Sequence, residues 1–194
     1  MDMCKSLRDP EGKAPRICSE EVVVIIWYGE VGQQIAIRAQ LLGMKVLVSG
    51  RKGAPNNAHA ARVPFETVLR NSSVVFVTFP RVRETMKLIS HTEFGLVPRH
   101  AILINISRGG IVDEGALIMA LKARQIAGAA TDVFLHEPAS LENSVLLCTG
   151  TEDLNLVVTP HSAWFTKNTR LNFMACLQKN IVSWVERKPC NLVV

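Results

Sequence analysis

The sequence predicts an α/β domain in which a doubly wound parallel sheet carries helices on both faces. Short runs that are mostly apolar alternate with amphipathic stretches along most of the chain. Strands without a polar face are typical of parallel sheets that helices cover on each side. With 194 residues, 48% of them apolar, the chain is long enough for a single domain with a substantial core.

Six apolar runs predict the strands of this sheet. They lie at residues 22–27, 45–48, 74–78, 101–106, 127–133 and 155–158. Two longer segments between them, residues 53–61 and 138–153, are irregular and rich in small or polar residues, as is typical of loops.

The amphipathic stretches between these runs predict the helices. Apolar residues share one helical face in residues 33–42 and 113–124: Ile35, Ala36, Ala39 and Leu42 in the first, Leu117, Ala120 and Leu121 in the second. Asp113 and Glu114 stand at the amino end of the second helix, where carboxylates cap free N–H groups. Further helices are expected at residues 66–70 and 167–184, and another helical stretch begins at 84–89.

Composition narrows the class of protein. No run approaches the roughly 18 apolar residues that cross a bilayer, and the start of the chain is charged where a signal peptide would be apolar. Five scattered cysteines without a C-x-x-C pair indicate free thiols, and we expect a cytoplasmic protein without metal or membrane partner. The net charge of +5 is spread along the chain, which suits a phosphate-bearing cofactor better than nucleic acid.

A nucleotide-binding fingerprint with one altered position follows the first strand. Gly29, Glu30, Val31 and Gly32 open the helix and match the end of G-x-G-x-x-G, but Trp27 replaces its first glycine. Gly29 would let the backbone approach a pyrophosphate, and Gly32 would let helix and strand pack closely. Trp27 is expected to strain the tight turn or crowd the cofactor; the alternative is an ordinary strand-to-helix turn.

The end of the second strand indicates which dinucleotide is bound. An acidic residue at this place would hold the ribose hydroxyls of NAD, whereas Ser49, Gly50, Arg51 and Lys52 offer two cations and no carboxylate. Two cations favour the 2′-phosphate of NADP. NAD stays possible, because the two cations could simply belong to a solvated loop.

Three later segments lie at the carboxyl ends of predicted strands. They are Asn105-Ile106-Ser107-Arg108-Gly109-Gly110-Ile111-Val112-Asp113, Asp132-Val133-Phe134-Leu135-His136-Glu137-Pro138 and Thr159-Pro160-His161. With their order and spacing, these segments make the sequence from Gly29 to Val194 resemble the D-isomer-specific 2-hydroxyacid dehydrogenase family. That group includes glyoxylate and hydroxypyruvate reductases and phosphoglycerate dehydrogenases. The resemblance implies a Rossmann-like domain and hydride transfer between a nicotinamide cofactor and a 2-hydroxy or 2-keto acid.

The chemistry of that reaction suits three of these residues. Reducing a 2-keto acid needs a cation for the substrate carboxylate, a proton donor for the developing alkoxide and a carboxylate that keeps the donor charged. Arg108, His161 and Glu137 fit these roles in that order, and strand ends should gather them at one sheet edge. Other interpretations are a helix-entry arginine, a capping or core histidine and an exposed loop glutamate.

The resemblance also implies cofactor contacts outside the fingerprint. Thr78, Phe79 and Pro80 match the segment on the adenosine side, Ile106 and Ser107 pass the nicotinamide ribose, and Asp132 meets the nicotinamide amide. Arg81 matches nothing obligatory in the family, but it could add to recognition of a 2′-phosphate.

The resemblance predicts three parts: a leader at residues 1–20 left from an interdomain segment, an NAD(P)-binding domain at 21–166, and a closing helix with its tail at 167–194. Family members carry a second, substrate-binding domain, which we expect to be mostly absent here, leaving the closing helix without its usual partner. A homodimer through the short leader is one possibility. The competing functions are a dinucleotide-binding or partner-binding module without turnover and a non-functional truncation product.

Overall fold

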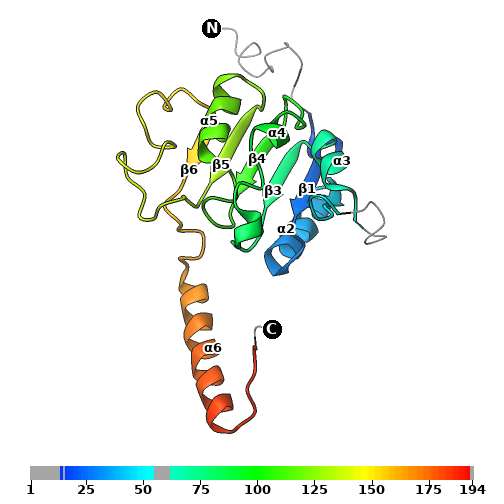
Figure 1. Ribbon diagram of the computed structural model, residues 1–194. Helices are drawn as coiled ribbons and strands as arrows, with labels where there is room; N and C mark the ends of the chain where they lie inside the picture. The colour runs from blue at the N-terminus through cyan, green and yellow to red at the C-terminus, as the bar shows by residue number, and fades with distance from the viewer. Residues whose placement is uncertain (1–13, 15, 55–61, 193–194) are drawn as a thin grey trace. The chain divides into compact units, whose positions relative to one another are not determined.

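The computed structural model describes residues 14, 16–54 and 62–192. Its contacts divide the chain into two compact units, Met1–Pro160 and His161–Val194, each of which is described by itself. The first unit contains a six-stranded, wholly parallel sheet in the order β2-β1-β3-β4-β5-β6 (Figure 1). The predicted doubly wound α/β class is therefore confirmed.

The strands follow the predicted runs and are slightly shorter. They are β1 (Val22–Ile26), β2 (Lys45–Val48), β3 (Val74–Val77), β4 (Ile102–Asn105), β5 (Gly128–Thr131) and β6 (Leu156–Val158). The helices of this unit are α2 (Glu30–Leu41), α3 (Phe65–Arg70), α4 (His91–Phe94) and α5 (Glu114–Lys122), with short 3-10 turns η1 (Cys18–Glu20) and η2 (Arg83–Thr85).

The topology places a switch point beside β1. The chain leaves β1 for β2 on one side of it and then returns to β3 on the other side. All six strands are parallel, so their carboxyl ends lie at one edge of the sheet. Open α/β sheets bind ligands at this edge, next to the switch point.

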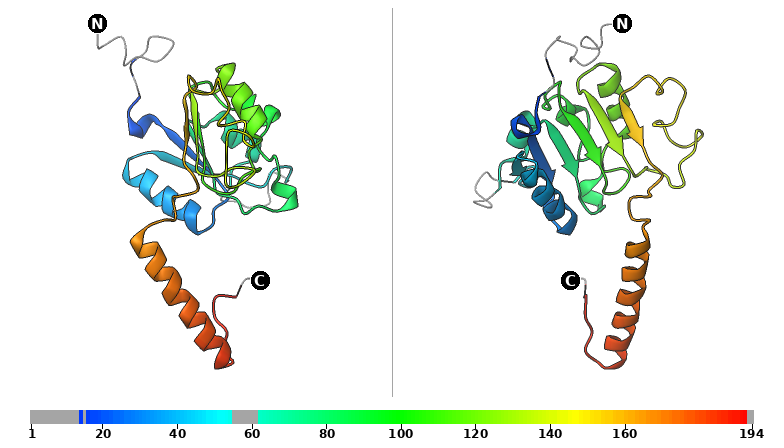
Figure 2. Two further views of the ribbon diagram at one scale, coloured as in Figure 1. Left: turned by 90° about the vertical axis from the view of Figure 1, so that its left-hand side faces the viewer. Right: turned by 180° about the vertical axis from the view of Figure 1, so that it is seen from behind.

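Two apolar clusters hold helices against opposite faces of the sheet. The larger cluster packs α3, α4 and α5 on one face, and its buried side chains from those helices include Phe65, Phe94 and Leu117. The smaller cluster packs Ala36 and Ala39 of α2 against β1 on the other face. Figure 2 shows the sheet between these layers. The central strands are buried as predicted, whereas the edge strands β2 and β6 are only partly covered.

The expected helical stretch at residues 84–89 is wrong beyond its first turn. Only η2 forms, because Lys87 adopts a positive φ of 51° and the chain then runs beside residues 110–113. Ile89 donates its N–H to Ile111 and accepts one from Asp113, and these bonds hold the segment extended.

Helix α4 was missed in the sequence, although its capping box is present. The Glu93 carboxylate accepts from the N–H of Ser90 at 3.0 Å, and serine followed three residues later by glutamate is a helix-start signal. The helix has only four residues, too few for an amphipathic period to stand out.

The predicted cap of α5 is confirmed. Asp113 accepts from the N–H groups of Gly115 and Ala116 and pairs with Lys87 at 3.0 Å. Burial alone would raise the pKa of Asp113, but the bonds from Lys87 and from the helix N–H groups outweigh it, so that this pKa lies below its usual value. Glu114 has a further role, since its carboxylate accepts from the N–H of Leu135 at 2.6 Å and so anchors the loop after β5.

The second unit contains the predicted closing helix, α6 (Lys167–Val185). Thr166 caps it by accepting from the N–H of Thr169 at 3.1 Å. Within the described part of this unit, no residue of α6 is buried. In the described parts of both units, no helix is long and apolar enough to cross a membrane.

Candidate nucleotide-binding and active site

The turn from β1 into α2 takes a left-handed backbone at Trp27. Its φ of 81° ends the strand at Ile26, one residue earlier than predicted. Residues other than glycine rarely adopt this conformation, which costs on the order of 1–3 kcal/mol. The position where the fingerprint has glycine is thus a position where the backbone favours glycine.

At the other two fingerprint glycines, neighbouring atoms leave no room for a side chain. A Cβ atom on Gly32 would lie 2.5 Å from the carbonyl oxygen of Trp27, and one on Gly29 would lie 2.9 Å from the indole Nε1 of Trp27. Gly29 stands just ahead of α2, whose first N–H groups have no partner within the helix. This bare helix amino end fits an anionic group such as a pyrophosphate.

Thr78 and Phe79, which follow β3, hold Trp27 in this turn. The Thr78 hydroxyl lies 2.6 Å from the carbonyl oxygen of Trp27 and 3.0 Å from that of Ile26, so it can donate to either. The rings of Trp27 and Phe79 pack with their centroids 5.1 Å apart. The indole is therefore fixed beside Gly29, on the surface that a cofactor would approach.

These residues line a depression of about 470 Å³ at the carboxyl edge of the sheet. The predicted site residues that the structure brings together here are Gly29, Glu30, Val31, Gly32, Thr78, Phe79, Pro80, Ile106, Ser107 and Arg108. Trp27 and Arg81 complete the lining. Four predicted cofactor residues, Ser49, Arg51, Lys52 and Asp132, lie outside it.

The loop after β2 holds three of those four. Ser49 is buried and turns its hydroxyl to the carbonyl of Gly50. The Lys52 side chain is engaged within the domain. Its ammonium pairs with buried Glu93 at 2.6 Å and donates to the carbonyl of Leu88. Arg51 is exposed and forms no ion pair with any described residue. Of the two cations, Arg51 is the one that this arrangement leaves available.

Asp132, at the end of β5, is buried rather than in the depression. It accepts from the hydroxyl of Thr159, which directly follows β6, at 2.5 Å. This bond ties together the two strand ends that carry the acidic and histidine segments.

The loop after β4 is shaped by Asn105, a role that the sequence-based prediction missed. Its buried amide oxygen accepts from both the N–H and the hydroxyl of Ser107, at 3.2 and 2.6 Å. Its amide nitrogen donates to the carbonyl of Arg108 at 3.4 Å. An asparagine side chain bonded to the backbone beyond it is a common turn device, so this role was available from the sequence.

A second hollow, of about 390 Å³, adjoins this loop. It is lined by Arg81, Arg108, Gly109, Phe134, Leu135, His136 and Glu137. Arg108 and Arg81 line both hollows, so the predicted substrate arginine stands where the two meet. Glu137 accepts from the N–H of Phe134 at 2.9 Å, which orients its carboxylate within the loop.

His161 is the first residue of the second unit and has a φ of 52°. Its approach to Arg108 and Glu137 stays a prediction.

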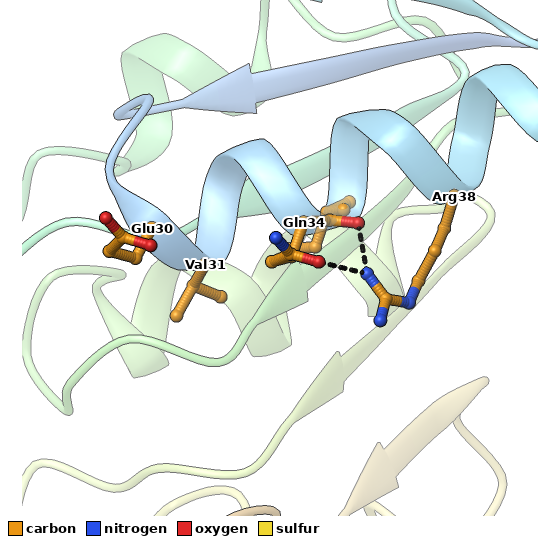
Figure 3. Close-up of a pocket in the computed structure, with 5 residues that line it drawn as sticks. Glu30, Val31, Gln34 and Arg38 are labelled. Atoms are coloured by element: carbon orange, nitrogen blue, oxygen red, sulfur yellow. Dashed lines mark hydrogen bonds between the residues drawn. The ribbon is translucent and has the colours of Figure 1, made fainter.

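A third depression, of about 270 Å³, lies on one side of α2 and shares Glu30 and Val31 with the first (Figure 3). Its lining is Glu30, Val31, Gln34, Ile35 and Arg38, and Arg38 donates to the carbonyl and side-chain oxygens of Gln34. Since a single helix forms it and no strand end reaches it, we do not place the site there.

The sheet order, the turn after β1 and the depression beside it define a Rossmann-like domain. Comparison with known proteins then identifies its family. The profile of the D-isomer specific 2-hydroxyacid dehydrogenase, NAD binding domain, matches residues 7–163. The glycerate dehydrogenase of Methylorubrum extorquens is 41% identical over 173 residues, which cover 87% of this chain and 51% of that protein. The glyoxylate reductase of Thermococcus litoralis is 37% identical over 173 residues, covering 87% of this chain and 50% of that protein.

Solved structures agree. The NAD-complexed D-isomer specific 2-hydroxyacid dehydrogenase of Lactobacillus delbrueckii ssp. bulgaricus superposes with a TM-score of 0.76 at 26% identity, covering 95% of this chain and 59% of that one. The D-lactate dehydrogenase of Lactobacillus jensenii with NAD⁺ gives 0.77 at 26% identity, covering 96% and 59%. The chain therefore belongs to the D-isomer specific 2-hydroxyacid dehydrogenase family, as its NAD-binding domain. It spans about half the length of the curated relatives it matches.

Proposed function

We propose that this chain is the cofactor-binding half of an oxidoreductase that interconverts 2-hydroxy and 2-keto acids. The observation that carries the proposal is the meeting of two hollows at Arg108: one is lined by the fingerprint, the other by Glu137. A nicotinamide dinucleotide would supply or accept the hydride. Relatives named glyoxylate reductase and glycerate dehydrogenase support a small 2-keto or 2-hydroxy acid as substrate.

The first hollow would hold the dinucleotide. Gly29 and Gly32 keep the amino end of α2 open to a pyrophosphate, and the helix N–H groups would bind its oxygens. Thr78, Phe79 and Pro80 would line the adenosine side. Ile106 and Ser107 would contact the nicotinamide ribose, while Asp132, held by Thr159, would receive the nicotinamide amide.

The second hollow would hold the substrate. The Arg108 guanidinium suits a planar carboxylate and would also polarise the adjacent carbonyl. His161 would give the proton to the developing alkoxide, and Glu137 would keep that imidazole charged and oriented. In the oxidising direction the same histidine would take the proton back.

We infer a preference for NADP over NAD. Gly50 offers no carboxylate to the ribose hydroxyls, and Arg51 is an exposed cation in the same loop. Lys52 supports this loop through Glu93, so we assign the 2′-phosphate chiefly to Arg51.

Titration of the chain with each reduced dinucleotide, followed by nucleotide fluorescence, tests both proposals. We expect NADPH to bind about tenfold more tightly than NADH, since a charge-assisted hydrogen bond is worth roughly 1.5–3 kcal/mol. Arg51→Asp should bring the two dissociation constants together. Arg99→Asp is the matched control, because Arg99 is exposed ahead of β4, at the amino edge of the sheet. Equal or tighter NADH binding contradicts the preference, and binding of neither dinucleotide contradicts the proposed function.

A second candidate function is a binding module of this family that lacks turnover. The observation in its favour is Trp27, whose left-handed turn and indole beside Gly29 both oppose cofactor entry. Weak dinucleotide binding would leave the sheet edge to other small ligands.

Two substitutions at Trp27 separate these candidates. Trp27→Gly relieves both the left-handed turn and the crowding by the indole, whereas Trp27→Ala removes the indole and keeps the turn. We expect Trp27→Gly to lower the NADPH dissociation constant by about tenfold, as relief of roughly 1–3 kcal/mol of backbone strain allows. Trp27→Ala should gain less. If neither variant binds more tightly than the parent in the same fluorescence titration, the indole is accommodated and the objection to cofactor binding is removed.

We also propose a cellular location, a domain organisation and an oligomeric state. The described cysteines are free thiols, and their free state supports a cytoplasmic protein. We propose residues 1–20 as part of an interdomain segment, 21–166 as the cofactor domain and 167–194 as a helix and tail that pack on a substrate domain. A homodimer is compatible with this arrangement.

A further inference from the structure

Arg81 occupies a place that the proposed reaction does not yet use. It follows β3 and lines both hollows together with Arg108. Its side chain is exposed and forms no ion pair with any residue that the structure describes. A second cation therefore stands beside the arginine assigned to the substrate carboxylate.

The backbone on both sides of Arg81 is fixed by one buried hydroxyl. The Thr85 oxygen accepts from the N–H of Val82 at 2.9 Å. The same hydroxyl lies 3.0 Å from the carbonyl oxygen of Pro80 and 2.9 Å from that of Val82, and it can donate its hydrogen to either. Arg81 is thus presented from a braced turn rather than from a loose loop.

The sheet order separates Arg81 from the loop that would read a 2′-phosphate. That loop follows β2, beyond β1, whereas Arg81 follows β3 and its neighbours in the second hollow follow β4 and β5. The structure therefore gives no support to a role for Arg81 beside Arg51. It favours a role on the substrate side.

The charges of the second hollow indicate what it would bind. Arg81 and Arg108 bring two cations, and Glu137 brings one carboxylate. If Glu137 serves the histidine, a substrate with a single carboxylate would use only Arg108. A second guanidinium is then available for another negative group.

We propose that Arg81 binds a second anionic group, so that this site selects short 2-hydroxy or 2-keto acids with a carboxylate or phosphate at the far end. The inference rests on the proposed function, because that function assigns the first carboxylate to Arg108. Guanidinium groups bind carboxylate and phosphate with the same paired donors, so either terminal group suits the site.

Binding of product-like acids tests the proposal without turnover. Isotope-labelled chain would be titrated with D-glycerate, D-malate and 3-phospho-D-glycerate, first without nucleotide and then with NADPH. NMR signals of the arginine side-chain N–H groups provide the readout. We expect at least one of the two doubly anionic acids to bind about tenfold more tightly than D-glycerate, the size of one charge-assisted hydrogen bond.

Variants decide whether Arg81 is responsible. Arg81→Gln should bring the doubly anionic acids to within about twofold of D-glycerate, whereas Arg108→Gln should weaken all three. Arg83→Gln is the matched control, since Arg83 is exposed two residues further on and lines neither hollow. Thr85→Val should reduce the preference for the doubly anionic acids by about threefold, and Thr85→Ser should restore it, if the hydroxyl positions Arg81.

The outcomes are distinct. Tight binding of 3-phospho-D-glycerate alone assigns a phosphate, and tight binding of D-malate as well assigns any terminal anion. An Arg81→Gln variant that weakens all three acids equally, or none, overturns the proposal. If NADPH never binds but the Arg81-dependent preference persists, the proposed function fails and the anion site stands.

Discussion

Produced by itself, the 194-residue chain is expected to reduce glyoxylate or hydroxypyruvate with NADPH at least 100-fold more slowly than the ordinary enzyme rate of about 10 per second. Arg108 and Arg81 are both exposed, so a bound substrate would face water. Positioning and the exclusion of solvent reorganisation can be worth roughly 7–11 kcal/mol of the barrier, and an open site loses much of this. NADPH consumption at saturating keto acid measures the rate.

Comparing the parent with His161→Ala, and assaying both over a range of protein concentrations, shows what produces any residual activity. Any residual turnover should fall by a further factor of about 100 or more in His161→Ala, if this histidine is the proton donor. Activity that rises faster than protein concentration would indicate that a second copy completes the site. A rate near 10 per second that His161→Ala abolishes would show that this chain alone suffices, against our expectation.

Gly109→Ala is expected to destabilise the first unit by about 3 kcal/mol, at the upper end of the usual cost of overpacking. A Cβ atom at this position would overlap both the carbonyl oxygen and the carbonyl carbon of Phe134. Both atoms belong to backbone, so no side-chain rotation relieves the contact. The loops that carry Arg108 and Glu137 would have to move apart. Urea unfolding followed by circular dichroism gives the change in unfolding free energy.

Gly115→Ala is the matched control for this substitution. A Cβ atom there meets only the Asp113 carboxylate, at 3.4 Å, and the residue lies in the first turn of α5. Alanine inside a helix is favoured over glycine by roughly 0.5–1 kcal/mol. Gly115→Ala should therefore be neutral or slightly stabilising. A Gly109→Ala protein with the parent's stability and the parent's affinity for NADPH would contradict the close approach of the two loops.

The fold could be predicted because the sequence patterns that indicate strands and helix starts are local and recur along the chain. Each strand consists mainly of apolar residues, and Asp113 caps α5 as its position before an apolar helix indicates. The resemblance to the family is confirmed by the match over residues 7–163. The end of β1 was misplaced by one residue because the left-handed turn at Trp27 depends on how residues 78 and 79 pack against it, and no local pattern reports such packing.

The sequence predicted most of the residues of the candidate site, but not which of them lie next to one another. Strand order decides which loops adjoin, and the sequence alone does not show that Arg81 stands with Arg108 rather than with Arg51. The engagement of Lys52 by Glu93 joins residues more than forty positions apart, which short-range spacing does not reveal. The helical stretch predicted at residues 84–89 was wrong for the same reason, since the segment that pairs with it, residues 110–113, comes later in the chain.

The contact between Lys52 and Glu93 has a consequence for how cofactor choice could change. In the loop after β2, Lys52 stabilises the fold by pairing with buried Glu93. Its exposed neighbour Arg51 forms no ion pair with any described residue. Under our proposal, structural support and nucleotide discrimination belong to adjacent but separate side chains. If Arg51 binds the 2′-phosphate as proposed, a single substitution at residue 51 would remove the preference for NADPH at little cost in unfolding free energy. Mutation could retune this loop while its framework stays in place.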